Sequence, residues 1–178
     1  MTTAADVRTA HTWELAPHEL TSVRSLLFHA FDGDFGDEDW DHTLGGVHAL
    51  IRDGHGLAAH GAVVMRRVRY GRHWLRTGYV EGVAVRPDVR RQGLGGAVMA
   101  ALEGVVTRAY DLGALSASDE GAALYAARGW RAWEGRICGL GPDGVVRLPD
   151  EEGSTYVWPA PADLTGELVF DWRDGDVL

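Results

Sequence analysis

The sequence predicts a single domain of the α/β (α+β) class, in which helices flank a mixed, mostly antiparallel sheet. The chain has 178 residues, a length that fits one compact domain with a substantial core. Segments with apolar residues at helical spacing alternate with short segments rich in β-branched and aromatic residues. We find no internal repeat and no interdomain linker, so we assign residues 1–178 to one domain.

The elements of the first half follow from local patterns. His11–Leu15 is expected to form a short first strand, and Pro17–Phe31, with apolar residues at helical spacing, an amphipathic helix. The acidic segment Asp32–Asp41 is broken by glycine and predicts a loop with a short helical turn. Turn signals then separate three strands, Val47–Ile51, Leu57–Tyr70 and Trp74–Arg86.

The second half alternates helices with shorter strands. A helix is expected from Gly95 to Tyr110 and a strand at Leu115–Ala117. A second helix, Asp119–Arg128, has Ser118 or Asp119 as N-cap and Gly129 as its stop. The remaining strands, interrupted by a turn at Gly141–Gly144, are Trp130–Trp133, Ile137–Leu140, Thr155–Trp158 and Glu167–Trp172.

Composition narrows the class of protein. No apolar run approaches the ~18–20 residues of a membrane span. Met1–Arg8 has no basic region followed by an apolar stretch, so no secretory signal is expected. The formal charge of −9 argues against nucleic acid and anionic membrane as partners. The one cysteine, Cys138, excludes an intrachain disulfide and suits the cytoplasm.

The charges are unevenly distributed. All 17 basic residues are arginine, and many of them lie between Arg66 and Arg91. Acidic residues gather in Asp32–Asp41, in Asp150–Glu152 and after Asp171. Such a chain suits an anionic cofactor together with a cationic substrate, although acidic clusters are also typical of a solvated surface.

A glycine-rich loop between a strand and a helix predicts an anion site. The strand ends at Arg86, the loop carries Arg90 and Arg91, and Gly93 and Gly95 open the helix. Glycines let backbone amides approach an anion such as a pyrophosphate, and the helix N-terminus adds partial positive charge. A Walker loop needs a lysine, which the chain lacks, and a dinucleotide fingerprint would follow the first strand. The remaining alternative is a tight turn with surface arginines.

The pattern Arg90-x-x-Gly93-x-Gly95 resembles the R/Q-x-x-G-x-G/A motif of GNAT acetyltransferases. Ala123–Trp130 resembles that family's A-x-x-x-Y-x-x-x-G-F/W signature. Outside this core, Phe31–Asp41, Pro149–Ser154 and the tail Phe170–Leu178 resemble the aminoglycoside 2'-N-acetyltransferases, most specifically in Asp-Trp-Arg-x-Gly-Asp-Val. The resemblance implies the GNAT acetyltransferase fold, with acetyl-CoA as cosubstrate.

The resemblance also implies roles for the core residues. Glu81 is the candidate base, acting through water, and Tyr125 the candidate general acid for the leaving thiolate. A tyrosine pKa near ~10 lies above a thiol pKa near ~8.5, so the phenol would stay protonated until it donates. The alternatives are an ordinary polar strand residue and a core tyrosine. The residues implied to bind the cofactor are Val83, Ala84 and Val85 for the pantetheine arm and Arg90, Arg91, Gln92, Gly93, Leu94 and Gly95 for the pyrophosphate.

Carboxylates are implied to bind the ammonium groups of the substrate. The substrate-binding residues implied by the resemblance are Asp34, Glu81, the Gly82 backbone, Ser116, Asp150, Glu151 and the carboxylate of Leu178, with Asp39 as a weaker addition. The chain departs from the subfamily in ending in leucine rather than tryptophan. Glu151 and Glu152 also stand where aspartates are common.

The sequence therefore predicts a cytoplasmic enzyme that acetylates the 2'-amine of aminoglycosides and confers resistance, and the resemblance implies a homodimer. No metal site is expected, because the histidines lack H-x-x-x-H and H-E-x-x-H spacing, and Cys138 is expected to be a buried, inert thiol. Two alternatives stay open. One is a GNAT enzyme for another amine, such as a polyamine or peptide N-terminus, and the other is a non-catalytic acetyl-CoA-binding module.

Overall fold

The computed structural model describes residues 6–178 and divides them into two compact units. The first unit contains the described residues up to Val64 together with Val80–Val105, and the second contains Met65–Tyr79 and Val106–Leu178. Residues 1–5, on which part of the expectation about a secretory signal falls, lie outside the described residues. Within residues 6–178, no helix has the length and apolar character needed to cross a membrane.

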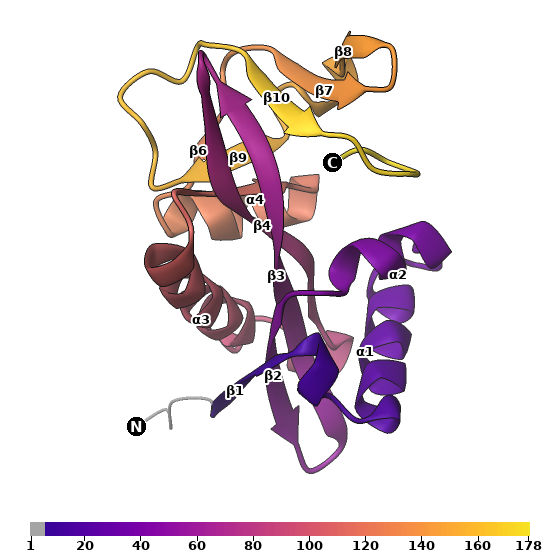
Figure 1. Cartoon of the computed structure of the whole chain (residues 1–178). Coiled ribbons are helices and arrows are strands. Elements are labelled where there is room, and N and C mark those ends of the chain that lie inside the picture. Colours follow the sequence, from indigo (N-terminus) through magenta and orange to yellow (C-terminus); the bar gives the residue numbers. More distant parts are fainter. Residues whose placement is uncertain (1–5) are drawn as a thin grey trace. The chain divides into compact units, whose positions relative to one another are not determined.

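In the first unit, helices pack on both faces of an antiparallel sheet (Figure 1). The strands β1 (Val7–His11), β2 (Val47–Asp53) and the first part of β3 (Gly56–Tyr70) pair in that order. The unit also holds the end of β4 (His73–Val85) and three helices, α1 (Pro17–Ala30), α2 (Asp37–Thr43) and most of α3 (Leu94–Ala109).

The two helical layers of this unit contact the sheet differently. Val23, Leu26 and Leu27 of α1 form a buried core with Leu50 of β2. On the other face, a Cβ placed at Gly61 of β3 would lie 2.7 Å from a methyl of Val98 on α3. Only glycine therefore lets α3 approach β3 so closely.

The second unit is a mixed sheet with the strand order β6-β9-β5-β4-β3-β10-β7-β8. Strand β5 is parallel to β4 and β10 is parallel to β7, whereas β9, β6 and β8 form antiparallel pairs. Helix α4 (Asp119–Ala127) belongs to this unit. The strands not yet bounded are β5 (Leu112–Ser116), β6 (Arg131–Ala132), β7 (Ile137–Gly141), β8 (Gly144–Arg147), β9 (Thr155–Trp158) and β10 (Leu168–Asp171).

Large aromatic side chains form the core of the second unit. Trp130, Trp133, Tyr79 and Phe170 are each at most 2 % exposed. Tyr79 meets Phe170 edge to face, with ring centroids 5.9 Å apart. Edge-to-face contacts are a favoured arrangement of aromatic rings, so this pair ties β4 to β10.

The predicted mixed, mostly antiparallel sheet with flanking helices is confirmed. Helices α1, α3 and α4 lie within two residues of the predicted bounds, and the Ser118 Oγ accepts a hydrogen bond from the Gly121 amide, as expected of an N-cap. The strand predicted at His11–Leu15 is wrong. The strand there is Val7–His11, and the chain then turns through a 3-10 helix at Thr12–Glu14, because Glu14 accepts a hydrogen bond from the His11 amide at 2.7 Å.

Candidate active site

Strand β4 bends at Gly82, beside the candidate base Glu81. Gly82 has φ +55°, in the left-handed region that favours glycine. A Cβ at this position would lie 3.2 Å from Leu27 and 3.4 Å from Thr43, so the conformation favours glycine and the surrounding space is tight. Glu81, Gly82 and Val83 are half-buried, and the Gly82 carbonyl accepts a hydrogen bond from the His60 Nδ1 at 2.8 Å.

The residues proposed for the pantetheine arm, Val83, Ala84 and Val85, form the end of β4. Ala84 is 5 % exposed, whereas its two neighbours are half-buried. The Arg86 amide then donates to the Ala58 carbonyl at 2.8 Å, which ties the chain to β3 directly after these residues.

The loop before α3 has the features of an anion site. Arg90, Arg91, Gln92 and Gly93 are exposed, and α3 begins at Leu94. Arg91 and Gly93 have φ values of +61° and +83°, so the chain turns sharply before the helix. The amides at the first turn of a helix lack intrahelical acceptors and point toward an anion placed there.

The basic residues of the sequence cluster do not all serve this loop. Arg86 pairs with Asp53 at 2.6 Å and with Asp88 at 2.6 Å, and its hydrogen bond lowers the pKa of Asp53 to about 2. Arg90 turns its Nε back to the Val85 carbonyl at 3.3 Å. Three further arginines of the cluster, Arg66, Arg69 and Arg76, are ion-paired within the second unit. Arg86 therefore stabilises the loop, and its guanidinium is already paired with two carboxylates rather than left for a phosphate.

Tyr125, the candidate acid, lies on α4 and is 8 % exposed. Its ring lies 6.4 Å from the rings of Trp130 and of Tyr156. Burial raises the pKa of Tyr125 to about 12, since the charged phenolate is poorly solvated there. The phenol is therefore protonated at neutral pH.

Two of the predicted substrate-binding residues meet in the second unit. The Ser116 Oγ, at the end of β5, donates to Glu151 Oε2 at 2.9 Å. Glu151 closes a 3-10 helix, Pro149–Glu151, and its carbonyl accepts hydrogen bonds from the hydroxyls of Ser154 and Thr155. Asp150, in the same turn, is exposed.

The neighbouring Glu152 has a different role. Its carboxylate forms a two-point pair with Arg147, with both distances 2.9 Å. The Arg147 hydrogen bond lowers the pKa of Glu152. Glu152 therefore stabilises the loop through an ion pair, whereas the Glu151 carboxylate accepts from the hydroxyls of Ser116 and Ser154.

The tail, Phe170–Leu178, is held by a buried guanidinium. Arg66 is 3 % exposed and its Nε donates to Asp171 Oδ1 at 2.7 Å. The other Arg66 nitrogens donate to the carbonyls of Asp171 and Val177, and Arg173 Nε donates to the same Val177 carbonyl at 3.0 Å. Both guanidiniums lie over the ring of Tyr79. The residue before Leu178 is therefore held by two cations.

Asp34 and Asp39 differ in exposure and in hydrogen bonding. Asp34 is exposed in the turn after α1, where its amide donates to the Phe31 carbonyl at 2.9 Å. Asp39 lies in α2 and its Oδ2 accepts from the Gly36 amide at 2.7 Å. Asp39 thus caps its own helix, which gives it a structural role that sequence reasoning did not separate from binding.

The predicted site residues are divided between the two units. Asp34, Glu81, Gly82 and the cofactor residues belong to the first unit, and Ser116, Tyr125, Asp150, Glu151 and Leu178 belong to the second. The sequence missed two groups that hold them: His60, which contacts Gly82, and Arg66, which holds the tail. A histidine or arginine inside an otherwise apolar strand was the available signal, because such residues are rarely buried without a partner.

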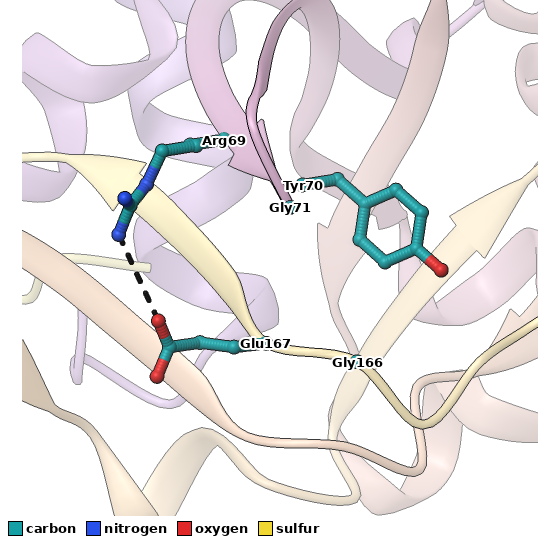
Figure 2. Close-up of a pocket in the computed structure, with 5 residues that line it drawn as sticks. All are labelled: Arg69, Tyr70, Gly71, Gly166 and Glu167. Atoms are coloured by element: carbon teal, nitrogen blue, oxygen red, sulfur yellow. Dashed lines mark ion pairs between the residues drawn. The ribbon is translucent and has the colours of Figure 1, made fainter.

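Two other features lie apart from these residues. A pocket of about 310 Å³ in the second unit is lined by Arg69, Tyr70, Gly71, Gly166 and Glu167, with Arg69 and Glu167 3.7 Å apart across it (Figure 2). None of the predicted site residues lines it. Cys138 is 3 % exposed, and burial raises the pKa of its thiol, as expected of an unreactive cysteine. Residues 6–178 contain no group of three or more side chains that could hold a metal ion.

Comparison with known proteins identifies the family of this chain. The profile of the acetyltransferase (GNAT) family matches residues 11–130. An aminoglycoside 2'-N-acetyltransferase from Mycolicibacterium fortuitum is 49 % identical over 176 residues, covering 96 % of this chain and 90 % of that protein.

Solved structures show the same fold. A GNAT family N-acetyltransferase from Escherichia coli in complex with CoA superposes with a TM-score of 0.63 at 18 % identity, covering 94 % of this chain and 89 % of that one. An acyl-CoA N-acyltransferase from Pseudomonas aeruginosa gives a TM-score of 0.60 at 19 % identity, covering 85 % and 97 %. The chain belongs to the acetyltransferase (GNAT) family and, within it, to the aminoglycoside 2'-N-acetyltransferases.

Proposed function

We propose that this protein transfers the acetyl group of acetyl-CoA to the 2'-amine of aminoglycoside antibiotics and thereby confers resistance. The observation that carries the proposal is the 49 % identity to an aminoglycoside 2'-N-acetyltransferase over nearly the full length of both chains. Fold similarity alone would name neither the reaction nor the amine.

The first unit is proposed to bind acetyl-CoA. The exposed turn Arg90–Gly93 and the start of α3 at Leu94 offer backbone amides and the positive end of a 16-residue helix to the pyrophosphate. Gly95, in the first turn of the helix, has no side chain and is proposed to let the pyrophosphate approach the backbone. Val83–Val85, just beyond the bend at Gly82, are proposed to bind the pantetheine arm by their backbone groups.

Glu81 and Tyr125 are proposed to handle the protons. Glu81, through water, accepts a proton from the substrate ammonium, and the neutral amine then attacks the thioester carbonyl carbon. Collapse of the tetrahedral intermediate breaks the C–S bond and releases a thiolate. The Tyr125 pKa of about 12 is roughly three to four units above that of a thiol at ~8.5, which disfavours a free tyrosinate. Tyr125 therefore stabilises the leaving sulfur as a hydrogen-bond donor. The proton that converts the thiolate to a thiol comes from the attacking nitrogen, which is cationic in the tetrahedral intermediate and loses this proton as it becomes the amide.

The carboxylates of Asp34, Asp150, Glu151 and the Leu178 terminus are proposed to bind the remaining ammonium groups of the substrate. Glu151 supports this best, because Ser116 fixes one of its oxygens and leaves the other able to accept. The glutamate is one methylene longer than the aspartate common in the subfamily, which bears on substrate range. We further propose a cytoplasmic homodimer without nucleic-acid or membrane partners.

The proposal is tested by substrate choice. With acetyl-CoA, aminoglycosides that carry a 2'-amine should release thiol, whereas those with a 2'-hydroxyl should not. Mass spectrometry of the product should place a single acetyl group on the 2'-nitrogen. Comparable turnover of the 2'-hydroxyl compounds would refute the proposed regiochemistry. Turnover only of polyamines or peptides would favour another GNAT specificity, and no turnover of any amine would favour a binding module.

A further inference from the structure

A chain of buried hydrogen bonds in the first unit ends at the Gly82 carbonyl. The Thr12 Oγ1 lies 2.7 Å from His48 Nε2, and His48 Nδ1 lies 2.9 Å from His60 Nε2. His60 Nδ1 lies 2.8 Å from the carbonyl oxygen of Gly82. Both rings are fully buried, at 0 % exposure, so each polar atom must find its partner within the protein.

Strand register brings the two rings together. His48 on β2 is opposite Ala62 of β3, and His60 on β3 is opposite Leu50 of β2. The histidines are therefore diagonal neighbours on one face of the sheet, and their ring centroids are 5.2 Å apart. Leu50 packs against α1, so this is the face that α1 covers.

The carbonyl at the end fixes the direction of every bond in the chain. A carbonyl only accepts, so His60 carries its proton on Nδ1 and donates to Gly82. With both rings neutral, the His60 Nε2 accepts from His48 Nδ1, and the His48 Nε2 accepts from the Thr12 hydroxyl. The Thr12 hydroxyl has one hydrogen, and its other acceptor, the Gly46 carbonyl, is more distant at 3.3 Å and already accepts from the Thr12 amide. The Thr12 oxygen in turn accepts from the Gly45 amide at 2.9 Å. All four groups are satisfied in this arrangement, with both imidazoles neutral and in the Nδ1–H tautomer.

Their surroundings keep the rings neutral. Burial, with a smaller contribution from His11, lowers the pKa of His48 to about 4. Burial and the neighbouring His48 lower the pKa of His60 to about 3. Because the last acceptor is a carbonyl, which takes no proton, the chain cannot deliver one to the site. Its effect is on geometry.

We propose that His60, supported by His48 and Thr12, is a positioning residue that holds the Gly82 carbonyl, and so the bend of β4, in the conformation that aims Glu81. The inference rests on the proposed function, since it takes Glu81 as the base. Gly82 is held in two ways. Its carbonyl accepts the His60 hydrogen bond, and Leu27 and Thr43 pack close to its Cα. Release of the carbonyl would let the left-handed residue relax and displace Glu81. Displacements of this kind cost rate rather than binding.

Two amide substitutions separate positioning from packing. Asparagine places its amide nitrogen near the histidine Nδ1, so His60→Asn keeps a donor for Gly82 and loses the acceptor for His48. Glutamine places its amide near Nε2, so His60→Gln keeps the acceptor and loses the donor to Gly82. Both variants leave one buried group unpaired, and their melting temperatures should fall by similar amounts.

The rates should differ where the stabilities do not. For an aminoglycoside substrate, kcat should fall by about tenfold to a hundredfold in His60→Gln and by less than about threefold in His60→Asn, on the scale of a misplaced catalytic group. The KM for acetyl-CoA should change little in either variant. Equal kcat values in the two variants would overturn the proposal.

A second measurement does not depend on activity. The ring-nitrogen NMR shifts of the parent protein should show both histidines as neutral Nδ1–H tautomers from pH 6 to pH 8. The carbonyl-carbon shift of Gly82 should move in His60→Gln and stay near the parent value in His60→Asn. An Nε2–H tautomer at His60 would overturn the proposal even in an active enzyme. If no aminoglycoside is acetylated, the proposed function fails on its own, while these shifts still decide whether His60 holds Gly82.

Discussion

In the first unit, two histidines are buried as neutral rings, whereas in the second unit Arg66 is buried with its charge. His60 ends a chain of neutral groups at the Gly82 carbonyl. Arg66 instead binds one carboxylate and two carbonyls of the tail and lies 5.1 Å from the Tyr79 ring centroid. Both devices fix a backbone carbonyl next to a proposed site residue, Glu81 in one case and Leu178 in the other.

The difference lies in what each device requires. A neutral chain needs a correct donor and acceptor at every link, but no counterion. A buried guanidinium needs a carboxylate and loses several kcal/mol of hydration, so it is stable only while all its partners are present. The first device therefore controls geometry within a strand. The second fastens a segment that lies more than 100 residues away in the sequence.

Tyr125→Phe should give the largest effect and extends the comparison to a third buried group. Like the histidines, Tyr125 is kept neutral by burial, and its proton is proposed to serve the leaving thiolate. We expect kcat to fall by roughly tenfold to thousandfold, with acetyl-CoA binding nearly unchanged. Thiol-release kinetics and calorimetry measure the two quantities. Tyr156→Phe, at the neighbouring ring, is the control and should stay close to the parent. A kcat that is unchanged at every pH would make Tyr125 a packing residue.

Arg66→Met directly tests the contribution of the buried Arg66 guanidinium. Removal of one partner from a buried ion pair costs about 3–5 kcal/mol, and the lower end applies because the Asp171 side chain is 41 % exposed. We expect the free energy of unfolding in urea to fall by about 3 kcal/mol and the aminoglycoside KM to rise, without a change in the acetyl-CoA KM. Arg69→Met is the matched control, because its 3.7 Å pair with Glu167 is partly exposed and should contribute at most about 1 kcal/mol. Equal losses in the two variants would remove the distinction.

Acidification tests whether His48 and His60 are held in their neutral forms. An unfolded histidine titrates near ~6.5, whereas burial lowers the folded pKa of His48 to about 4 and of His60 to about 3. The unfolded chain therefore binds more protons, and stability falls as the pH drops below ~6.5. Between pH 6 and pH 5, each histidine should contribute a loss of about 1.2 kcal/mol.

Urea unfolding at the two pH values measures this loss. In His60→Asn, the loss of unfolding free energy between pH 6 and pH 5 should be smaller than in the parent by the contribution of one histidine. A parent protein with no loss between pH 6 and pH 5 would mean that the rings are not held neutral.

Asp34→Asn should give the smallest effect. Its carboxylate is exposed, and exposed ion pairs contribute about 0–1 kcal/mol. The aminoglycoside KM should rise by no more than about fivefold, and the remaining effect should shrink in high salt. Asp32→Asn, in the same exposed turn, is the control. A rise of tenfold or more in Asp34→Asn alone would show that the carboxylate is desolvated when substrate is bound.

Local patterns predicted most of the fold. Helical spacing and the Ser118 cap set α1, α3 and α4, and the motif from Arg90 to Gly95 marked the loop before α3. Strand β8 was missed, because Val145 and Val146 are both exposed and adjacent, so the segment lacks the alternation of a half-buried strand. The sequence showed a turn there and no more.

The supports of the candidate site could not be read from the sequence. His48 and His60 meet only because β2 and β3 pair in one register, and a shift of one residue would turn one ring to the other face. Arg66 and Val177 are 111 residues apart, and no local spacing links them. Glu151 and Glu152 look alike in the sequence, but only Glu152 has Arg147 beside it.

The Arg66 contacts also have a consequence for the newly made chain. Arg66 leaves the ribosome with Met65–Tyr79, but the carboxylate that neutralises it, Asp171, is synthesised 105 residues later. At about 5–20 residues per second, the guanidinium waits roughly 5–20 s for its partner. During that time its burial would leave an uncompensated charge, so the second unit cannot close while it is being translated. The first unit is complete once Val80–Val105 has been synthesised, so it can form while the rest of the protein is still being made.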